Sequence, residues 1–347
     1  MDLNQLNRSI TALDQKAMEE AVQHWNNVAK PIGSLGQLEK MVTCIAGIQG
    51  TSKVNIEKRA LLVLCSDNGV TAQGVAMTPA EVTIIMTEFI AKRRSSVGVM
   101  AEYAHTDLFT VDMGMFSHAN VGNDLLLDRR VGDGTKDFTQ GPAMTRKQAE
   151  QAIQIGIDLV RDRKAEGYRL LATGEMGIGN TTTSSAIATV LLGKEVSEVT
   201  GPGVGLDEEG LNRKINAITK GIECNKPDAN DALDVLGKLG GFDIAAMAGV
   251  FIGGAIYHIP VLVDGVISSV AALVASRLCP HIRPYLLASH VSAEPAGSMV
   301  LDALGIVPLL HAGMRLGEGT GAVAIIPVLD MAIAVYDKVI TYSDIGM

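Results

Sequence analysis

The chain has 347 residues, of which 47% are hydrophobic and 37 are glycines, and its formal net charge is −9. This length accommodates one large α/β domain with a smaller appendage, or two domains, and the composition is typical of a buried parallel sheet with many tight loops. Because an acidic chain without a basic face cannot replace the counter-ions of a phosphate backbone, we exclude nucleic acid as a partner.

The four cysteines and seven histidines show no metal-ligand spacing such as CxxC or HExxH, which predicts a reduced, cytoplasmic protein without a metal site. The first residues, 1–4, contain no basic segment followed by an apolar one, so we expect no signal peptide. The most apolar stretch, 244–278, is interrupted by histidine, proline, aspartate and arginine. We therefore expect core helices there and no membrane-spanning segment.

The first 50 residues are predicted to be helical. An amphipathic helix covers Ala17–Val28, Pro31 ends it, and a second helix covers Leu35–Ile48. The turn between them, residues 30–36, has the sequence KPIGSLG. It is either a simple helix–helix linker or, through its lysine and serine, a contact for an anionic ligand.

From residue 60 onward, short apolar runs alternate with helical stretches, which is the pattern of a parallel sheet with crossover helices. Five strands are predicted, at Ala60–Cys65, Asp107–Val111, Arg169–Ala172, Ile259–Val263 and Tyr285–Ala288.

Polar residues recur where these strands end. They are Asp67, Asp112, Glu175, Asp264, and His290 with Ser292. A single aspartate at such a position commonly caps a helix. In open α/β sheets, however, ligands bind outside the carboxyl ends of the strands. Five polar positions therefore predict a polar cleft along one edge of the sheet.

The most informative stretch is residues 174–183, GEMGIGNTTT, which follows the third strand. Its three glycines, including Gly177 and Gly179, allow a tight turn and close approach to a ligand. The following helix begins near Asn180 and Thr181, and its free N–H groups form an anion cradle suited to a phosphate. The stretch matches neither the P-loop nor the dinucleotide fingerprint. An ordinary capped strand-to-helix turn is the alternative.

Further candidates lie near predicted helix starts. Lys214, early in the predicted helix Glu208–Cys224, is placed to reach a phosphate, and Asp243 follows two glycines as either a ligand contact or a cap. Glu318 lies between two glycines, which leave room for a flat ligand and expose the carboxylate, ahead of an apolar helix at Val323–Val335. The helix dipole would also favour a glutamate there. Together with Glu175 it forms a plausible acid/base pair.

Four segments, 30–36, 174–182, 240–243 and 315–319, resemble in order and spacing the nicotinate-nucleotide:dimethylbenzimidazole phosphoribosyltransferases of cobamide assembly. The resemblance covers nearly the whole chain. It implies a Rossmann-like parallel sheet flanked by helices, in a large domain of residues 56–319. It also implies a small helical domain built from residues 1–55 and 320–347, and a dimer.

The resemblance further implies that nicotinate mononucleotide donates phosphoribose to an aromatic base and releases nicotinate. Glu318 would be the general base, and Glu175 a second active-site carboxylate. The positions that match the family's phosphate and ribose contacts are Gly177, Asn180, Thr181, Lys214 and Ser292. Asp243 matches a position near the nicotinate. No cofactor or metal is implied, because the leaving ring is already cationic.

Two departures from the family pattern concern the acceptor. Asn68 replaces a histidine found in many relatives, and Met86 stands where a glutamine is expected in users of dimethylbenzimidazole. The acceptor pocket implied by the resemblance consists of Thr78, Met86, Leu316 and Gly317. A thioether lacks the donor and acceptor of an amide. Two alternatives therefore stay open: transfer to phenol or p-cresol as one subunit of a heterodimer, and a non-catalytic nucleotide-binding subunit.

Overall fold

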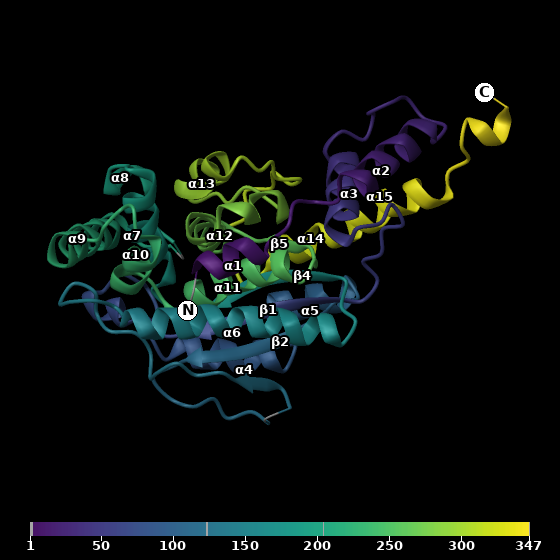
Figure 1. Ribbon diagram of the computed structural model, residues 1–347. Coiled ribbons are helices and arrows are strands. Elements are labelled where there is room, and N and C mark those ends of the chain that lie inside the picture. The colour runs from purple at the N-terminus through teal and green to yellow at the C-terminus, as the bar shows by residue number, and fades with distance from the viewer. Residues whose placement is uncertain (1–2, 123, 204, 347) are drawn as a thin grey trace.

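The computed structural model describes residues 3–122, 124–203 and 205–346 (Figure 1). Its centre is a six-stranded parallel sheet in the order β3-β2-β1-β4-β5-β6. The strands are β1 Arg59–Ser66, β2 Asp107–Gly114, β3 Leu126–Asp128, β4 Leu170–Met176, β5 Val261–Val263 and β6 Leu286–Ala288. This is the strand order of the doubly wound dinucleotide-binding fold. The predicted Rossmann-like α/β class is therefore confirmed.

All five predicted strands are present, but two details of the sheet differ from the prediction. Strand β3 was not predicted, because two of its three residues are only partly buried and the third is exposed at the edge of the sheet, so the apolar pattern is weak. Strand β4 extends to Met176, although its predicted end was Ala172. Residues after Ala172 keep pairing with β1, as in the register of Leu64 with Glu175. This pairing with a distant strand outweighs the local preference of Gly174 for a turn, so Glu175 lies within the strand.

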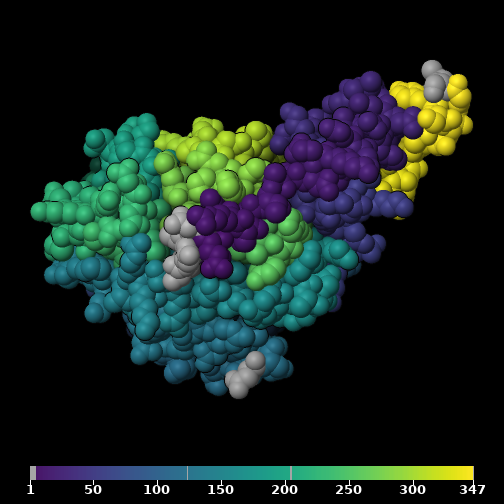
Figure 2. All heavy atoms as spheres, in the orientation of Figure 1, coloured from purple at the N-terminus to yellow at the C-terminus, as the bar shows by residue number. Residues whose placement is uncertain are grey.

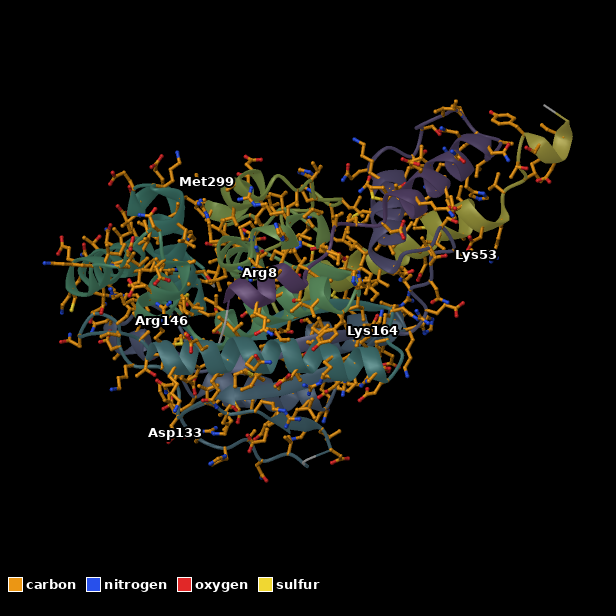
Figure 3. The ribbon with its side chains drawn as sticks, in the orientation of Figure 1. Arg8, Lys53, Asp133, Arg146, Lys164 and Met299 are labelled. Atoms are coloured by element: carbon orange, nitrogen blue, oxygen red, sulfur yellow. The ribbon has the colours of Figure 1, made fainter. Side chains whose placement is uncertain are left out.

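Two long helices, α6 Arg146–Ala165 and α11 Phe242–Ile256, pack against each other, and α11 also contacts β1, β2 and β4. Arg146 and Lys164 mark the two ends of α6 in Figure 3. A methyl group on Gly156 would lie 2.8 Å from the backbone nitrogen of Val250, so this helix contact requires glycine. Helices α11 and α12 (Val266–Leu278) are almost entirely buried, which confirms the core helices predicted over 244–278.

Segments from near the two ends of the sequence form a helical arm that projects from the body of the molecule and carries the C-terminus (Figures 1 and 2). It consists of α2 Gln15–Asn27, α3 Gln37–Gln49 and α15 Ile326–Lys338. Trp25 packs edge-on against Tyr336 with ring centroids 4.8 Å apart. In the linker between α2 and α3, Lys30 pairs with Glu39 at 2.6 Å. Helix α1, Leu3–Ser9, lies apart from the arm, where Asn7 contacts His281.

This arm contains most of the predicted small helical domain, whose boundaries at 1–55 and 320–347 stay a prediction. Residues 1, 2 and 347 of that prediction lie outside the described residues. The predicted helix Val323–Val335 is divided into α14 Thr320–Ala324 and α15. The break at Ile325 has a local cause, because Pro327 has no N–H to continue the hydrogen-bond ladder from α14.

Most of the other helices lie between successive strands, and the last of them follows β6. They are α4 Val82–Ala91, α5 Ser96–Tyr103, α7 Asn180–Leu192, α8 Val196–Val199, α9 Glu208–Asn225, α10 Ala232–Leu239 and α13 Ala296–Leu304, with 3-10 turns η1 Gly69–Gln73, η2 Pro280–Tyr285 and η3 Ser343–Ile345. Within the described residues, one helical stretch is long and apolar enough to cross a membrane, Thr320–Lys338, with a mean hydropathy of 1.6. Half of the most apolar 18-residue segment of this stretch is buried inside the protein, as is also typical of a core helix.

Candidate active site

A cavity of about 270 Å³ lies at the carboxyl edge of the sheet, where β4, β5 and β6 end. The predicted cleft at this edge is therefore present. Eleven of the predicted site residues line it: Thr78, Met86, Glu175, Gly177, Gly179, Asn180, Thr181, Ser292, Leu316, Gly317 and Glu318. Within the described residues, no group of three or more His, Cys, Asp or Glu side chains is arranged to hold a metal ion.

The glycine-rich cradle has the geometry that its sequence predicts. Gly179 adopts a left-handed conformation with φ +92°, which L-residues rarely adopt, and α7 begins at the next residue, Asn180. A methyl group on Gly177 would lie 3.0 Å from both the Asn68 amide nitrogen and Asp243 Oδ2. The glycines thus let the turn lie directly over the ends of β1 and α11, with the helix N-terminus facing the cavity.

Lys214 does not line the cavity. It is completely buried behind the cradle, where its Nζ donates to Thr181 Oγ1 at 2.9 Å and to the carbonyl oxygen of Gly201 at 3.0 Å. Burial lowers the pKa of Lys214 to about 8, and Glu294 opposes this shift. The lysine therefore fixes Thr181 and the neighbouring loop.

Asp243 also lies behind the cavity wall, in a cluster with Asn180 and Glu175. The Asn180 amide nitrogen donates to Asp243 Oδ2 at 3.1 Å and to Glu175 Oε2. Burial and the charge of Asp243 raise the pKa of Glu175 to about 8, while the Asn180 hydrogen bond lowers it. Burial raises the pKa of Asp243 to about 6. At neutral pH the cluster therefore favours one charged and one neutral carboxyl group.

Glu318 occupies a loop of three consecutive residues with positive φ: Gly317 at +87°, Glu318 at +61° and Gly319 at +92°. This conformation is unusual for glutamate and indicates that the surrounding contacts impose it. Its Oε2 accepts from the Val97 backbone N–H at 3.4 Å, and its own N–H faces Glu175 Oε1 at 3.4 Å. Burial raises the pKa of Glu318 above its ordinary range, against the Val97 and Ser95 hydrogen bonds.

The loop of Glu318 crosses β4 at Gly174. A methyl group on Gly174 would lie 2.7 Å from the carbonyl carbon of Glu318 and 2.9 Å from the backbone nitrogen of Gly319. Gly174 is thus needed for backbone contact between the two segments that carry Glu175 and Glu318. The geometry brings two buried carboxyl groups and a helix N-terminus to one cavity, as a group-transfer site for a phosphate ester requires.

A phosphoribosyltransferase family model matches residues 10–347 of the chain. The chain belongs to this family. Among its relatives, nicotinate-nucleotide–dimethylbenzimidazole phosphoribosyltransferases from Ruminiclostridium cellulolyticum and Acetivibrio thermocellus are each 42% identical, over 97% of this chain and 95% of theirs. The crystal structure of CobT from Thermus thermophilus superposes with a TM-score of 0.90 at 35% identity, covering 96% of this chain and 99% of that one.

Within this family fold, Asp264 and His290, two of the strand-end residues expected to face the cleft, also line the cavity. Asp264 Oδ1 accepts from the Ala322 backbone N–H at 2.9 Å and so fixes the start of α14, directly after the Glu318 loop. The His290 ring packs against Gly321, where no side chain would fit. Their position after β5 and β6 was the sequence signal that indicated this placement at the cleft, although the sequence assigned neither of them a role in binding or catalysis.

The expectation that Asp67 and Asp112 also face the cleft is wrong. Asp67 Oδ2 accepts from the Phe116 backbone N–H at 2.8 Å, and Asp112 pairs with Arg130 at 3.0 Å. Asp67 thereby fixes the loop that follows β2, Asp112 holds an arginine that follows β3, and neither carboxylate lines the cavity. Asn68, the first departure from the family pattern, lies buried beneath the cradle, with its Nδ2 3.4 Å from the carbonyl oxygen of Ile178.

Proposed function

We propose that the protein transfers 5-phosphoribose from nicotinate mononucleotide to dimethylbenzimidazole, giving an α-ribotide for cobamide synthesis and releasing nicotinate. The observation that carries the proposal is the pair of buried carboxyl groups, Glu175 and Glu318, beside a glycine cradle in one cavity. The activity for which the relatives are named, over 97% of this chain, supports the choice of donor and acceptor.

In this proposal the donor's phosphate lies on the cradle formed by Gly177, Gly179, Asn180 and Thr181, and Ser292, which lines the same cavity, also contacts the nucleotide. The N-terminus of α7 attracts the phosphate, and Lys214 stabilises it through Thr181. The phosphate lies away from the reacting ribose carbon, but its binding energy fixes the donor relative to the carboxyl groups and so positions that carbon.

The chemistry follows from the two glutamates. The bond from the ribose carbon to the pyridinium nitrogen breaks, and its electron pair neutralises the departing nicotinate ring. The acceptor nitrogen forms the new bond to that carbon, and its proton passes to the Glu318 carboxylate. Carboxylates near the reacting carbon stabilise the positive charge that develops on the ribose, and Glu175 is placed for this role.

The acceptor lies, in this proposal, between Met86 and the loop of Leu316 and Gly317, with Thr78 at the rim. Leu316 is half exposed, which leaves one side of the slot open. Thioether and leucine side chains suit a flat aromatic ring, and sulfur–aromatic contacts contribute ~0.3–1.5 kcal/mol.

The test is direct. The purified protein is incubated with nicotinate mononucleotide and dimethylbenzimidazole, and the ribotide and nicotinate are quantified by chromatography and mass spectrometry. Stoichiometric appearance of both products is expected, and omission of the base should abolish both. Binding of the nucleotide without either product would contradict catalysis and favour a non-catalytic subunit.

We also propose that two copies of the chain form a dimer. Neighbouring helices α4 and α5 expose four large apolar side chains, with exposed fractions of 49% for Ile85, 43% for Phe89, 50% for Val99 and 84% for Tyr103. Such a cluster is typical of a protein interface. Light scattering should give twice the monomer mass, and Tyr103→Lys should shift the protein toward monomer.

We propose a cytoplasmic location as well, which the four free thiols of the protein support.

A further inference from the structure

The buried cluster of Glu175, Asn180 and Asp243 has fewer hydrogen-bond donors than two charged carboxylates need. One amide nitrogen, Asn180 Nδ2, serves an oxygen of each acid. Asp243 gains a second donor from the Ile244 backbone N–H at 2.9 Å. The other oxygen of Glu175 faces only the Glu318 N–H, at 3.4 Å. Glu175 is therefore the less well stabilised anion of the two.

The charged groups around Glu175 are mostly acidic. Asp243 on α11, Asp264 after β5 and Glu318 before α14 are carboxyl groups, and Cys65 on β1 is a buried neutral thiol. The basic groups of the cavity wall are Arg315, which is exposed, and His290, which lies 4.0 Å from Asp264. In the described residues, no hydrogen bond or ion pair joins Glu175 or Asp243 to a lysine or arginine.

We propose that Glu175 holds a proton while the cavity is empty and releases it to solvent when the cationic pyridinium ring of the donor binds. This inference rests on the proposed function, because it takes the pyridinium nucleotide as the ligand. Two like charges that share one buried donor are costly, and a proton on one of them removes that cost. A cation beside the cluster supplies the missing counter-charge, so the proton leaves as the ring arrives.

The pKa of Glu175 near 8 in the free protein agrees with this geometry. The same exchange then assists turnover. When the glycosidic bond breaks, its electron pair passes to the ring nitrogen and makes the nicotinate ring neutral. Once the acceptor has taken the ribose and given its proton to Glu318, no counter-charge remains beside Glu175, which takes up a proton from solvent again. The site thereby loses its attraction for the leaving ring once the glycosidic bond has broken.

Isothermal titration calorimetry in buffers of different ionisation enthalpy measures the protons released on binding. Nicotinate mononucleotide is compared with ribose 5-phosphate, which has the same phosphate without the cation, so that phosphate ionisation cancels. We expect the nucleotide to release nearly one more proton per site at pH 7, and about half a proton more at pH 8, where a group with a pKa near 8 is half ionised.

Glu175→Gln should abolish this difference, and Asp302→Asn, which alters an exposed carboxyl group on α13 outside the cavity, should preserve it. Equal proton release for the two ligands in the wild-type protein would overturn the inference and leave the proposed function intact. Persistence of the difference in Glu175→Gln would overturn it as well. Failure of the wild-type protein to bind the nucleotide at all would instead overturn the proposed function.

Discussion

The contact between Gly174 and the Glu318 loop gives a prediction about catalysis that changes neither glutamate. Replacement of Gly174 by alanine introduces a methyl group 2.7 Å from the Glu318 carbonyl carbon and 2.9 Å from the Gly319 nitrogen, and both are backbone atoms. The Glu318 carbonyl oxygen lies closer still, and ordinary contacts begin at 3.4 Å, so the loop must move by roughly 1 Å. Because the loop carries the proposed base, the methyl group displaces that base.

A misplacement of this size typically costs ~10²-fold in rate. We therefore expect the kcat of Gly174→Ala to fall ~10²-fold, with overpacking destabilising the fold by about 1–3 kcal/mol. The assay is the initial rate of nicotinate release at saturating donor and acceptor, accompanied by thermal unfolding. Nucleotide binding should persist, because the methyl group lies away from the cradle.

A matched control is Gly237→Ala in helix α10, where the added methyl group meets only ordinary contacts beyond 3.4 Å. In a helix interior, alanine stabilises by about 0.5–1 kcal/mol relative to glycine. This variant should keep full activity. A folded Gly174→Ala protein with the kcat of the wild type would refute the claim that the position of the Glu318 loop limits catalysis.

Three further predictions concern the donor, the acceptor and pH. Lys214→Ala should weaken nucleotide binding by about 1.5–3 kcal/mol, measured by calorimetry, and reduce kcat less, because it frees Thr181 in the cradle; an unchanged dissociation constant would place the phosphate elsewhere. Met86→Gln should raise the ratio of turnover with dimethylbenzimidazole to turnover with p-cresol, because the amide can pair with the second ring nitrogen; an unchanged ratio would mean that Met86 does not set acceptor choice. Burial raises the pKa of Glu318, and a general base works only when ionised, so kcat should decline with falling pH at a pH above the ordinary glutamate range; a rate that is flat down to pH 4.5 would contradict this role.

Local sequence patterns predicted the strands, the cradle and the apolar helices, because each depends on residues that are near neighbours in the chain. They did not predict β3, whose three residues are held by pairing with β2. Nor did they predict that β4 continues through Gly174 and Glu175, since the partner strand β1 lies more than 100 residues earlier.

The positions of the charged side chains depended even more on distant contacts. Glu318 was recognised from its flanking glycines, but Gly174, which makes room for its loop, lies far away in the sequence. Lys214 has the spacing of a phosphate ligand, yet Thr181 and Gly201 hold it behind the cradle. Asp67 and Asp112 lie near strand ends as Asp264 does, but Asp67 binds the loop after β2 and Asp112 binds an arginine after β3.

The role of Glu318 as the general base is tested most directly by Glu318→Gln, which keeps the shape of the side chain and removes its ability to accept a proton. General-base removal typically costs ~10²–10⁴ in rate. We predict a loss of kcat of that size, while nicotinate mononucleotide binds with the affinity of the wild-type protein. Turnover within a few fold of wild type would contradict the role of Glu318 as the base and, with it, the proposed mechanism.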